Sequence, residues 1–145
     1  MQNTLRWSSI ALFAALSIFL VLFGALYASV RDFLPFHAAA APSDALDSMR
    51  PLYLALMKLI GGASGSLGAL GAFLALSAIR KGDKASAVAL AIAFAIPLVM
   101  AAYVAETLAA KTGAPTSWHI MGALLAVDVA ALLGILLGGR KSEAA

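Results

Sequence analysis

Asp128 is the residue of this sequence whose surroundings point most directly to chemistry. It lies near the middle of the apolar run MGALLAVDVAALLGILL, where inserting an aspartate into a membrane costs about 2.5–3.5 kcal/mol. So short a side chain cannot reach the membrane surface, so it is either protonated or faces polar groups or water inside a bundle. Asp128 could therefore handle a proton, an ion or a ligand, or it could fix helix packing by a hydrogen bond.

Lys58 and Glu106 form a second candidate pair. Lys58 lies about 10 Å inside its apolar run at 1.5 Å per residue, and Glu106 lies one turn from the end of another run. An ion pair would neutralise both groups, and Tyr103 lies one turn from Glu106 on the same helical face. The alternative stays open that Lys58 extends to the membrane surface and that Glu106 simply reaches water.

Two histidines, His37 and His119, could add acid–base or metal chemistry beside Glu106. Their spacing matches neither H-x-x-x-H nor H-E-x-x-H, so we predict no metal site. The chain has no cysteine, which excludes disulfides and thiolate chemistry. No phosphate-binding loop, dinucleotide fingerprint or G-x-S-x-G elbow is present. The sequence therefore predicts no catalytic residue, and it does not indicate whether the protein binds a cofactor.

The elements that would position these residues belong to a membrane protein. Of 145 residues 63% are hydrophobic and 12% are charged, whereas soluble domains are about half apolar and about a quarter charged. The net charge of +3 comes from residues scattered at the edges of apolar runs. This pattern argues against nucleic-acid binding and predicts membrane lipid as the partner.

Four runs are long enough to cross a bilayer, which takes about 20 apolar residues in a helix. They span about 5–30, 51–79, 85–110 and 117–138, and they predict an all-α, four-transmembrane-helix antiparallel bundle with a single domain over 1–145. The first run is longer than a signal-peptide core and lacks an A-x-A cleavage site, so we expect it to be retained.

The distribution of lysine and arginine predicts the orientation. One side of the membrane carries Arg6, Arg80, Lys81, Lys84, Arg140 and Lys141, and the other carries Arg31, Arg50 and Lys111. Short loops rich in these residues stay in the cytoplasm. We therefore expect both termini in the cytoplasm and the protein in the inner membrane.

The longest connector is the outer loop 31–50, RDFLPFHAAAAPSDALDSMR. Ser43 or Asp44 could cap a short helix with Asp47 in its first turn, because the positive end of the helix dipole favours acids. The aromatic residues and alanines suggest that this loop lies on the bilayer or covers the bundle. A solvated connector is the other interpretation.

The second run carries small residues along one face. At 100° per residue one stripe holds Lys58, Gly61, Gly62, Gly65, Ala69 and Ala72. Small residues let membrane helices approach closely, so we expect this stripe to face a neighbouring helix of this chain, of a partner protein or of a second copy in a homo-oligomer. Lys58 would then begin on the protein-facing side.

The segments LPFHA, PLYLALMKLIGG and TGAPTSWHIMGALL resemble small four-span bacterial membrane proteins of uncharacterised function. This resemblance implies the fold and carries over no activity. The leading hypothesis is a non-enzymatic membrane subunit that binds a hydrophobic ligand or a partner. The alternatives are a proton-coupled or small-molecule transporter that uses Asp128, and a membrane enzyme that acts on an apolar substrate.

Overall fold

The computed structural model describes residues 2–138, and its regular structure there is entirely helical. The four long helices are α1 (Gln2–Ala28), α3 (Leu46–Leu76), α4 (Lys84–Thr112) and α5 (His119–Gly138). A single turn, α2 (Pro35–Ala38), follows α1, and the 3-10 turn η1 (Ile79–Lys81) follows α3. All four long helices are long and apolar enough to cross a membrane, so the predicted fold class is confirmed.

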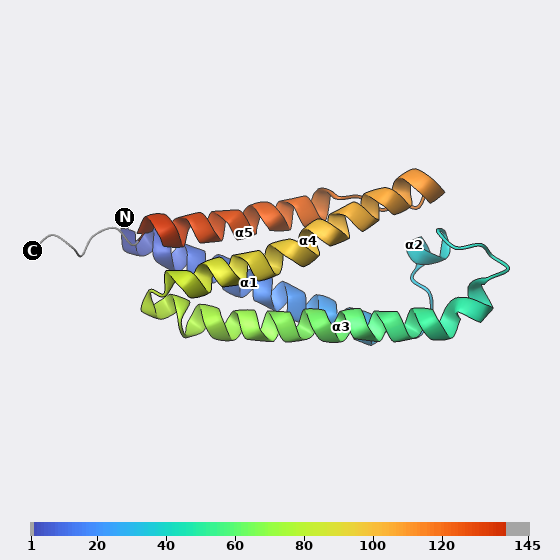
Figure 1. Ribbon diagram of the computed structural model, residues 1–145, viewed down its shortest axis with the longest axis horizontal. Helices are drawn as coiled ribbons and strands as arrows, with labels where there is room; N and C mark the ends of the chain where they lie inside the picture. The colour runs from blue at the N-terminus through green and yellow to red at the C-terminus, as the bar shows by residue number, and fades with distance from the viewer. Residues whose placement is uncertain (1, 139–145) are drawn as a thin grey trace, which may run out of the picture.

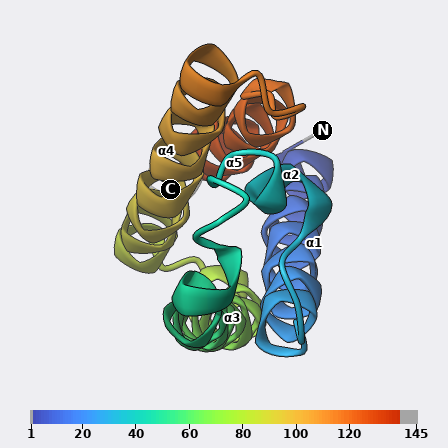
Figure 2. The same cartoon turned by 90° about the vertical axis from the view of Figure 1, so that its right-hand side faces the viewer.

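The long helices run antiparallel to their neighbours in the order α3, α1, α5, α4 around the bundle (Figures 1 and 2). Two names describe its ends. The termini end holds the start of α1, the end of α5 and η1, and the α2 end holds α2 and the loop around it. α1 packs extensively along α3 and α5, whereas α3 and α4 meet little and diverge toward the α2 end (Figure 1).

The hydrophobic core lies toward the termini end. Its fully buried members come from the first two thirds of α1, the end of α3 with η1, the first third of α4 and the second half of α5: Ile10, Phe13, Leu16, Leu20, Ala75, Ile79, Ala87, Leu90, Ala91, Phe94, Ala131 and Ile135. The outward faces of the same helices expose many large apolar side chains, which a membrane would cover with lipid.

Turn chemistry fixes both ends of α4. Gly82 has φ 99° and Gly113 has φ 69°, which is left-handed backbone that favours glycine. Between the first glycine and the helix, Asp83 caps α4 by accepting hydrogen bonds from the backbone N–H of Ala85 at 2.9 Å and of Ser86 at 3.3 Å. α4 therefore begins and ends at defined residues.

The second long helix begins earlier than the sequence predicts. α3 starts at Leu46 with Ala45 at the cap position and no side-chain cap, so Ser43 and Asp44 do not cap a separate helix. Pro51 lies inside α3 and removes the backbone hydrogen bond to the carbonyl of Asp47. Asp47 is exposed in the first turn, where water can satisfy that carbonyl, so the helix continues through the proline.

Candidate functional site

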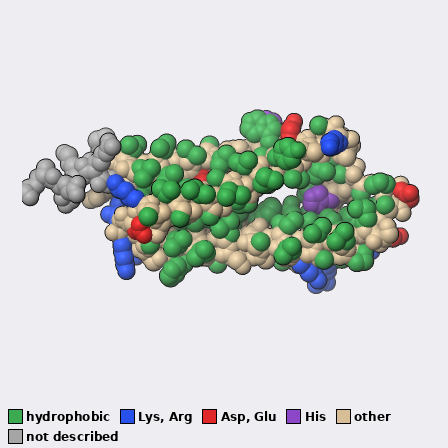
Figure 3. Space-filling model, in the orientation of Figure 1, with side chains coloured by type: hydrophobic (Ala, Val, Ile, Leu, Met, Phe, Trp, Pro, Cys, Tyr) green, Lys and Arg blue, Asp and Glu red, His purple; other side chains and the backbone are tan. Residues whose placement is uncertain are grey.

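A hollow opens in the bundle between α3 and α4 at the α2 end. Figure 3 shows it between the upper and lower helices on the side where they diverge. In Figure 2, which looks onto this end, α2 and its loop lie over the middle of the bundle. The loop is joined to α3, and α3 and α4 make little direct contact with each other.

The sequence of α4 explains why the hollow is not filled. Its interior face near the termini end holds Leu90, Phe94 and Leu98, all fully buried. The same face, continued at helical spacing, passes to smaller side chains that are half-buried: Ala101, Ala102, Ala105 and Ala109. Methyl groups cannot span the distance between two diverging helices, so the packed core ends where the alanines begin.

The loop over the hollow is fastened to α3 through Tyr53. Its hydroxyl accepts the backbone N–H of Leu34 at 3.0 Å and lies 2.9 Å from Nδ1 of His37. The ring of Phe33 stacks on the Tyr53 ring with the centroids 4.2 Å apart. We call Tyr53, Phe33, Leu34 and His37 the Tyr53 latch. An exposed ion pair between Arg50 and Asp32, at 3.3 Å, lies beside the latch.

The latch favours a neutral His37. Because the Tyr53 hydroxyl accepts from Leu34, its own hydrogen is free to be donated to Nδ1, which accepts when the ring is neutral. Burial lowers the pKa of His37 below its ordinary value, which acts in the same direction. Protonation would turn Nδ1 into a donor that faces the hydroxyl hydrogen.

Asp128 lies in the bundle interior. Its side chain is 1% exposed, and it shares the core-facing side of α5 with Ala131 and Ile135. Its Oδ1 is buried without any hydrogen-bond partner. Within residues 2–138 the one ion pair joins Arg50 to Asp32, so no cation compensates this carboxyl group. A buried polar atom left in this way is costly unless some other group supplies a partner.

The polar groups that could hydrogen-bond to Asp128 from other helices do not do so. No hydrogen bond between described residues joins it to Ser17, to Ser64 or to the backbone carbonyl of Ala93. The Ser17 hydroxyl instead donates to the carbonyl of Phe13 at 2.7 Å, one turn earlier in its own helix.

Lys58, Glu106 and Tyr103 all have exposed side chains. Among the residues described, no ion pair joins Lys58 to Glu106, because α3 and α4 diverge where the two residues lie. Their suggested ligand-binding or proton-binding roles stay predictions.

His119 and His37 contact different residues. It is exposed, hydrogen-bonds through Nδ1 to the Ser117 hydroxyl and stacks on Trp118, with the ring centroids 4.6 Å apart. His37 instead belongs to the Tyr53 latch. In the described part of the chain, no cluster of three histidine, aspartate or glutamate side chains could hold a metal ion.

Glycine residues make the closest contact between α1 and α3. A Cβ atom on Gly24 of α1 would lie 2.5 Å from the backbone nitrogen of Gly65 and 2.6 Å from the carbonyl oxygen of Gly61. Farther along α3, a Cβ on Gly68 would lie 2.6 Å from the carbonyl oxygen of Ser17. The backbones of the two helices therefore touch, and side chains at these positions would force them apart.

The rest of the predicted stripe is not covered within this chain. A Cβ on Gly62 or Gly65 would meet no atom within 4 Å, and Ala69 and Lys58 are exposed, while Ala72 is half-buried. The helix face that meets α1 runs through Gly61, Gly68 and Gly71, which is rotated from the predicted stripe. Whether another chain covers the remaining stripe stays a prediction.

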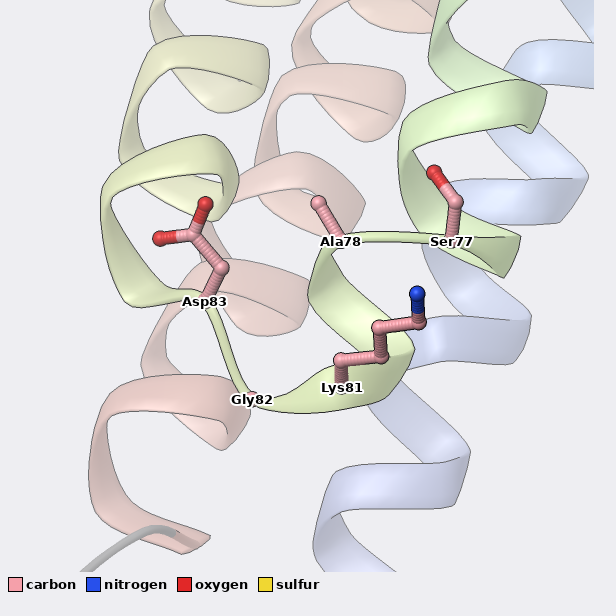
Figure 4. Close-up of a pocket in the computed structure, with 5 residues that line it drawn as sticks. All are labelled: Ser77, Ala78, Lys81, Gly82 and Asp83. Atoms are coloured by element: carbon pink, nitrogen blue, oxygen red, sulfur yellow. The ribbon is translucent and has the colours of Figure 1, made fainter.

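The termini end carries a cluster of cations around the connection from α3 to α4. Arg6 donates to the backbone carbonyl of Arg80, whose guanidinium lies 5.7 Å from the centre of the Trp7 ring. A shallow depression beside this connection is lined by Ser77, Ala78, Lys81, Gly82 and Asp83 (Figure 4). The Asp83 carboxylate is already hydrogen-bonded as the cap of α4. We therefore interpret this depression as part of the connection between α3 and α4 and not as a binding site.

The sequence analysis did not predict two features of the site, the Tyr53 latch and the contact of Gly24 with α3. The Tyr53 latch joins residues that lie 16 to 20 positions apart in the sequence. A contact over this separation leaves no local sequence pattern from which it could be predicted. Gly24 did carry a signal, because it is a lone glycine in the first apolar run at the depth of the glycine-rich segment of the second. Pairing the two would have indicated which part of α3 meets α1.

No family model, no curated protein and no solved structure matches this chain. The function must therefore be argued from the hollow, the Tyr53 latch and Asp128.

Proposed function

We propose that this protein is a small, non-enzymatic component of the inner membrane that binds a hydrophobic ligand in the hollow at its α2 end. The single observation that carries the proposal is the end of the packed core halfway along the bundle. There the interior face of α4 changes from Leu90, Phe94 and Leu98 to alanines, while α3 and α4 diverge. Space with apolar walls that opens toward lipid suits an acyl chain or a similar apolar molecule.

The charges support an orientation with both termini in the cytoplasm. The termini end carries Arg6, Arg80, Lys81 and Lys84 against the single carboxylate of Asp83 among its described residues. With this orientation the hollow and the Tyr53 latch would lie on the outer side of the membrane.

Substitution of Ala105 by phenylalanine tests the proposal. Ala105→Phe adds an aromatic ring to the interior face of α4 at the level of the hollow, whereas Ala89→Phe makes the same change on an exposed face of that helix. The protein is purified in native lipid, and the molecules that it retains after transfer to detergent are identified by native mass spectrometry. We expect a retained apolar molecule in the wild type and in Ala89→Phe, and about tenfold less in Ala105→Phe. Equal retention in all three proteins, or none in the wild type, would contradict the proposal.

A transport function is the second candidate, favoured by the buried and unpartnered carboxyl group of Asp128. Proton handling needs a group that can change its protonation state inside the membrane. Asp128→Asn in proteoliposomes separates the two: loss of proton or substrate flux with unchanged thermal stability supports transport, and loss of the fold supports a packing role.

A further inference from the structure

Two arginines and a tryptophan come together at the termini end, from α1 and from η1. Arg6 donates to the backbone carbonyl of Arg80, and the Arg80 guanidinium lies 5.7 Å from the centre of the Trp7 ring. We call Arg6, Trp7 and Arg80 the Arg80 cluster. We propose that this cluster binds the headgroup of an anionic phospholipid. The site is independent of the proposed function, because the hollow lies at the opposite end of the bundle.

No carboxylate of the described chain neutralises the positive charge of the Arg80 cluster. Arg80 is exposed, and within residues 2–138 no ion pair and no hydrogen bond uses its guanidinium. Asp83, the described acid at this end, accepts from the backbone of Ala85 and Ser86 and from the Ser86 hydroxyl. Two cations held together without an acid between them are stabilised when an anion binds both.

A phosphate group matches the donors of the Arg80 cluster. A guanidinium presents its N–H groups in a planar fork that can bind two phosphate oxygens at once. The cation–π contact with Trp7 limits the positions of the exposed Arg80 side chain, which lowers the entropy cost of binding an anion. Arg6 directs one guanidinium nitrogen to the Arg80 carbonyl, and among the described residues its other N–H groups have no acceptor.

The apolar surface beside the cluster favours a lipid over a soluble anion. Trp7 is 56% exposed near the start of α1, which is the usual position of a tryptophan at the membrane surface. Exposed apolar side chains continue from Trp7 along one face of α1 at helical spacing: Ala11, Ala15, Ile18 and Leu22. A phospholipid whose phosphate contacts the cluster would therefore place its hydrocarbon chains against this face.

The charge of the termini end favours a lipid with a net negative charge. Figure 3 shows Lys and Arg side chains gathered at this end, where Lys81 and Lys84 are exposed. Phosphatidylglycerol gains from these charges, whereas phosphatidylcholine carries no net charge. The proposed orientation places this end at the cytoplasmic leaflet, whose anionic lipids attract basic segments.

Brominated lipids, which quench tryptophan fluorescence at short range, test the inference on the full-length protein in lipid bilayers. The chain has two tryptophans, so Trp118→Phe leaves Trp7 as the reporter, and Trp7→Phe leaves Trp118 near the α2 end. The fraction of brominated phosphatidylglycerol in phosphatidylcholine is varied. At Trp7 we expect phosphatidylglycerol to bind about fivefold more tightly than phosphatidylcholine, which corresponds to about 1 kcal/mol for one arginine. At Trp118 the ratio should be about one, and a ratio of about one at Trp7 would overturn the proposal.

Two variants in the Trp118→Phe protein assign the preference to the cluster. Arg80→Gln removes the guanidinium from the Trp7 ring and should lower the preference at Trp7 to about one. Lys84→Gln removes one charge from the same end outside the cluster, and it should change the preference less than about twofold, because a distant charge is screened by salt. Both side chains are exposed, so both variants should fold. Equal effects of the two variants would show a general surface charge and would overturn the assignment to the cluster.

Inorganic phosphate separates a lipid headgroup from a soluble anion. Added at constant ionic strength, it should leave the preference at Trp7 unchanged, because it has no hydrocarbon chain to contact α1. Loss of the preference on addition of phosphate would overturn the lipid as the occupant and would indicate a site for a soluble phosphate compound.

Discussion

At the scale of single residues, the buried Asp128 and the half-buried His37 differ in what satisfies their polar atoms. His37 has a partner in the Tyr53 hydroxyl, which also accepts the backbone N–H of Leu34. Asp128 has an oxygen without a partner in the described chain. A satisfied group stabilises the local structure, whereas an orphaned group is tolerated where something else can bind it. His37 therefore belongs to the contacts that fasten the loop, whereas any functional role of Asp128 stays a proposal.

The Tyr53 latch should weaken on acidification. Burial lowers the pKa of His37 below its ordinary value of 6.5, so the open loop binds a proton more readily than the closed loop does. The contribution of His37 to closure is therefore complete above about pH 6.5 and is lost as the pH falls from there toward the lowered pKa. As the pH falls from about 8 to about 5, we expect the hydrogen exchange of the Leu34 amide, corrected for intrinsic rates, to become faster.

His37→Gln removes the titrating group and should abolish this pH dependence, whereas His119→Gln, at the exposed histidine, should retain it. Corrected exchange rates that stay constant in the wild type over the whole range would show that His37 does not control the loop.

At the scale of elements, the contact between α1 and α3 depends on backbones rather than on side chains. Gly24 lies against the backbone of Gly61 and Gly65, and no larger residue fits there without moving a helix. Membrane helices gain little from burying apolar side chains, since lipid is equally apolar, so close backbone approach is what favours their association. The long α1–α3 contact then holds one wall of the bundle in place while α4 diverges from α3.

Gly24→Ala should destabilise the bundle, and Gly62→Ala should not. The new methyl group on Gly24 would overlap backbone atoms of α3, and overpacking of this kind typically costs about 1–3 kcal/mol. The methyl group on Gly62 would meet nothing within 4 Å, and alanine favours a helix over glycine by up to about 1 kcal/mol. Unfolding of the two variants and the wild type in detergent micelles measures both effects.

Gly62→Ala also tests the predicted homo-oligomer. Loss of a dimer in cross-linking or light scattering, with the monomer as stable as the wild type, would indicate that a second copy covers the open part of the stripe. Equal destabilisation by Gly24→Ala and Gly62→Ala would contradict the assignment of Gly24 to the α1–α3 contact.

At the scale of the whole molecule, the bundle is closed at one end and open at the other. The core holds the termini end together, where the cations and the connection from α3 to α4 also lie. At the α2 end the interior face of α4 carries alanines, and the loop is fastened by the Tyr53 latch. The packed core and the fastened loop therefore lie at opposite ends, so that loop movement need not disturb the core.

The predicted orientation can be measured with single cysteines, because the natural chain has none. Ser43→Cys places a thiol on the exposed loop at the α2 end, and Lys81→Cys places one on the exposed connection at the termini end. With both termini in the cytoplasm, a membrane-impermeant maleimide added to intact cells should label Ser43→Cys only. Both variants should react after the cells are lysed. Labelling of Lys81→Cys alone in intact cells would reverse the orientation and place the hollow on the cytoplasmic side.

The sequence by itself determined the four apolar helices, because a backbone in lipid must satisfy its hydrogen bonds internally and about 20 apolar residues are needed for each crossing. It also singled out Asp128, whose position in an apolar run needs no tertiary information. It did not determine which face of α3 meets α1. Lipid-facing and protein-facing sides are equally apolar, and α3 offers small residues on several faces.

Only the tertiary structure decided that choice, since Gly24 of α1 selects the face through Gly61 and Gly68. The same is true of the divergence of α3 from α4, which keeps Lys58 and Glu106 unpaired, and of the Tyr53 latch. Each depends on where two helices far apart in sequence come to lie. Hydropathy reports whether a segment enters the membrane, whereas the shapes of facing helices decide how the segments pack.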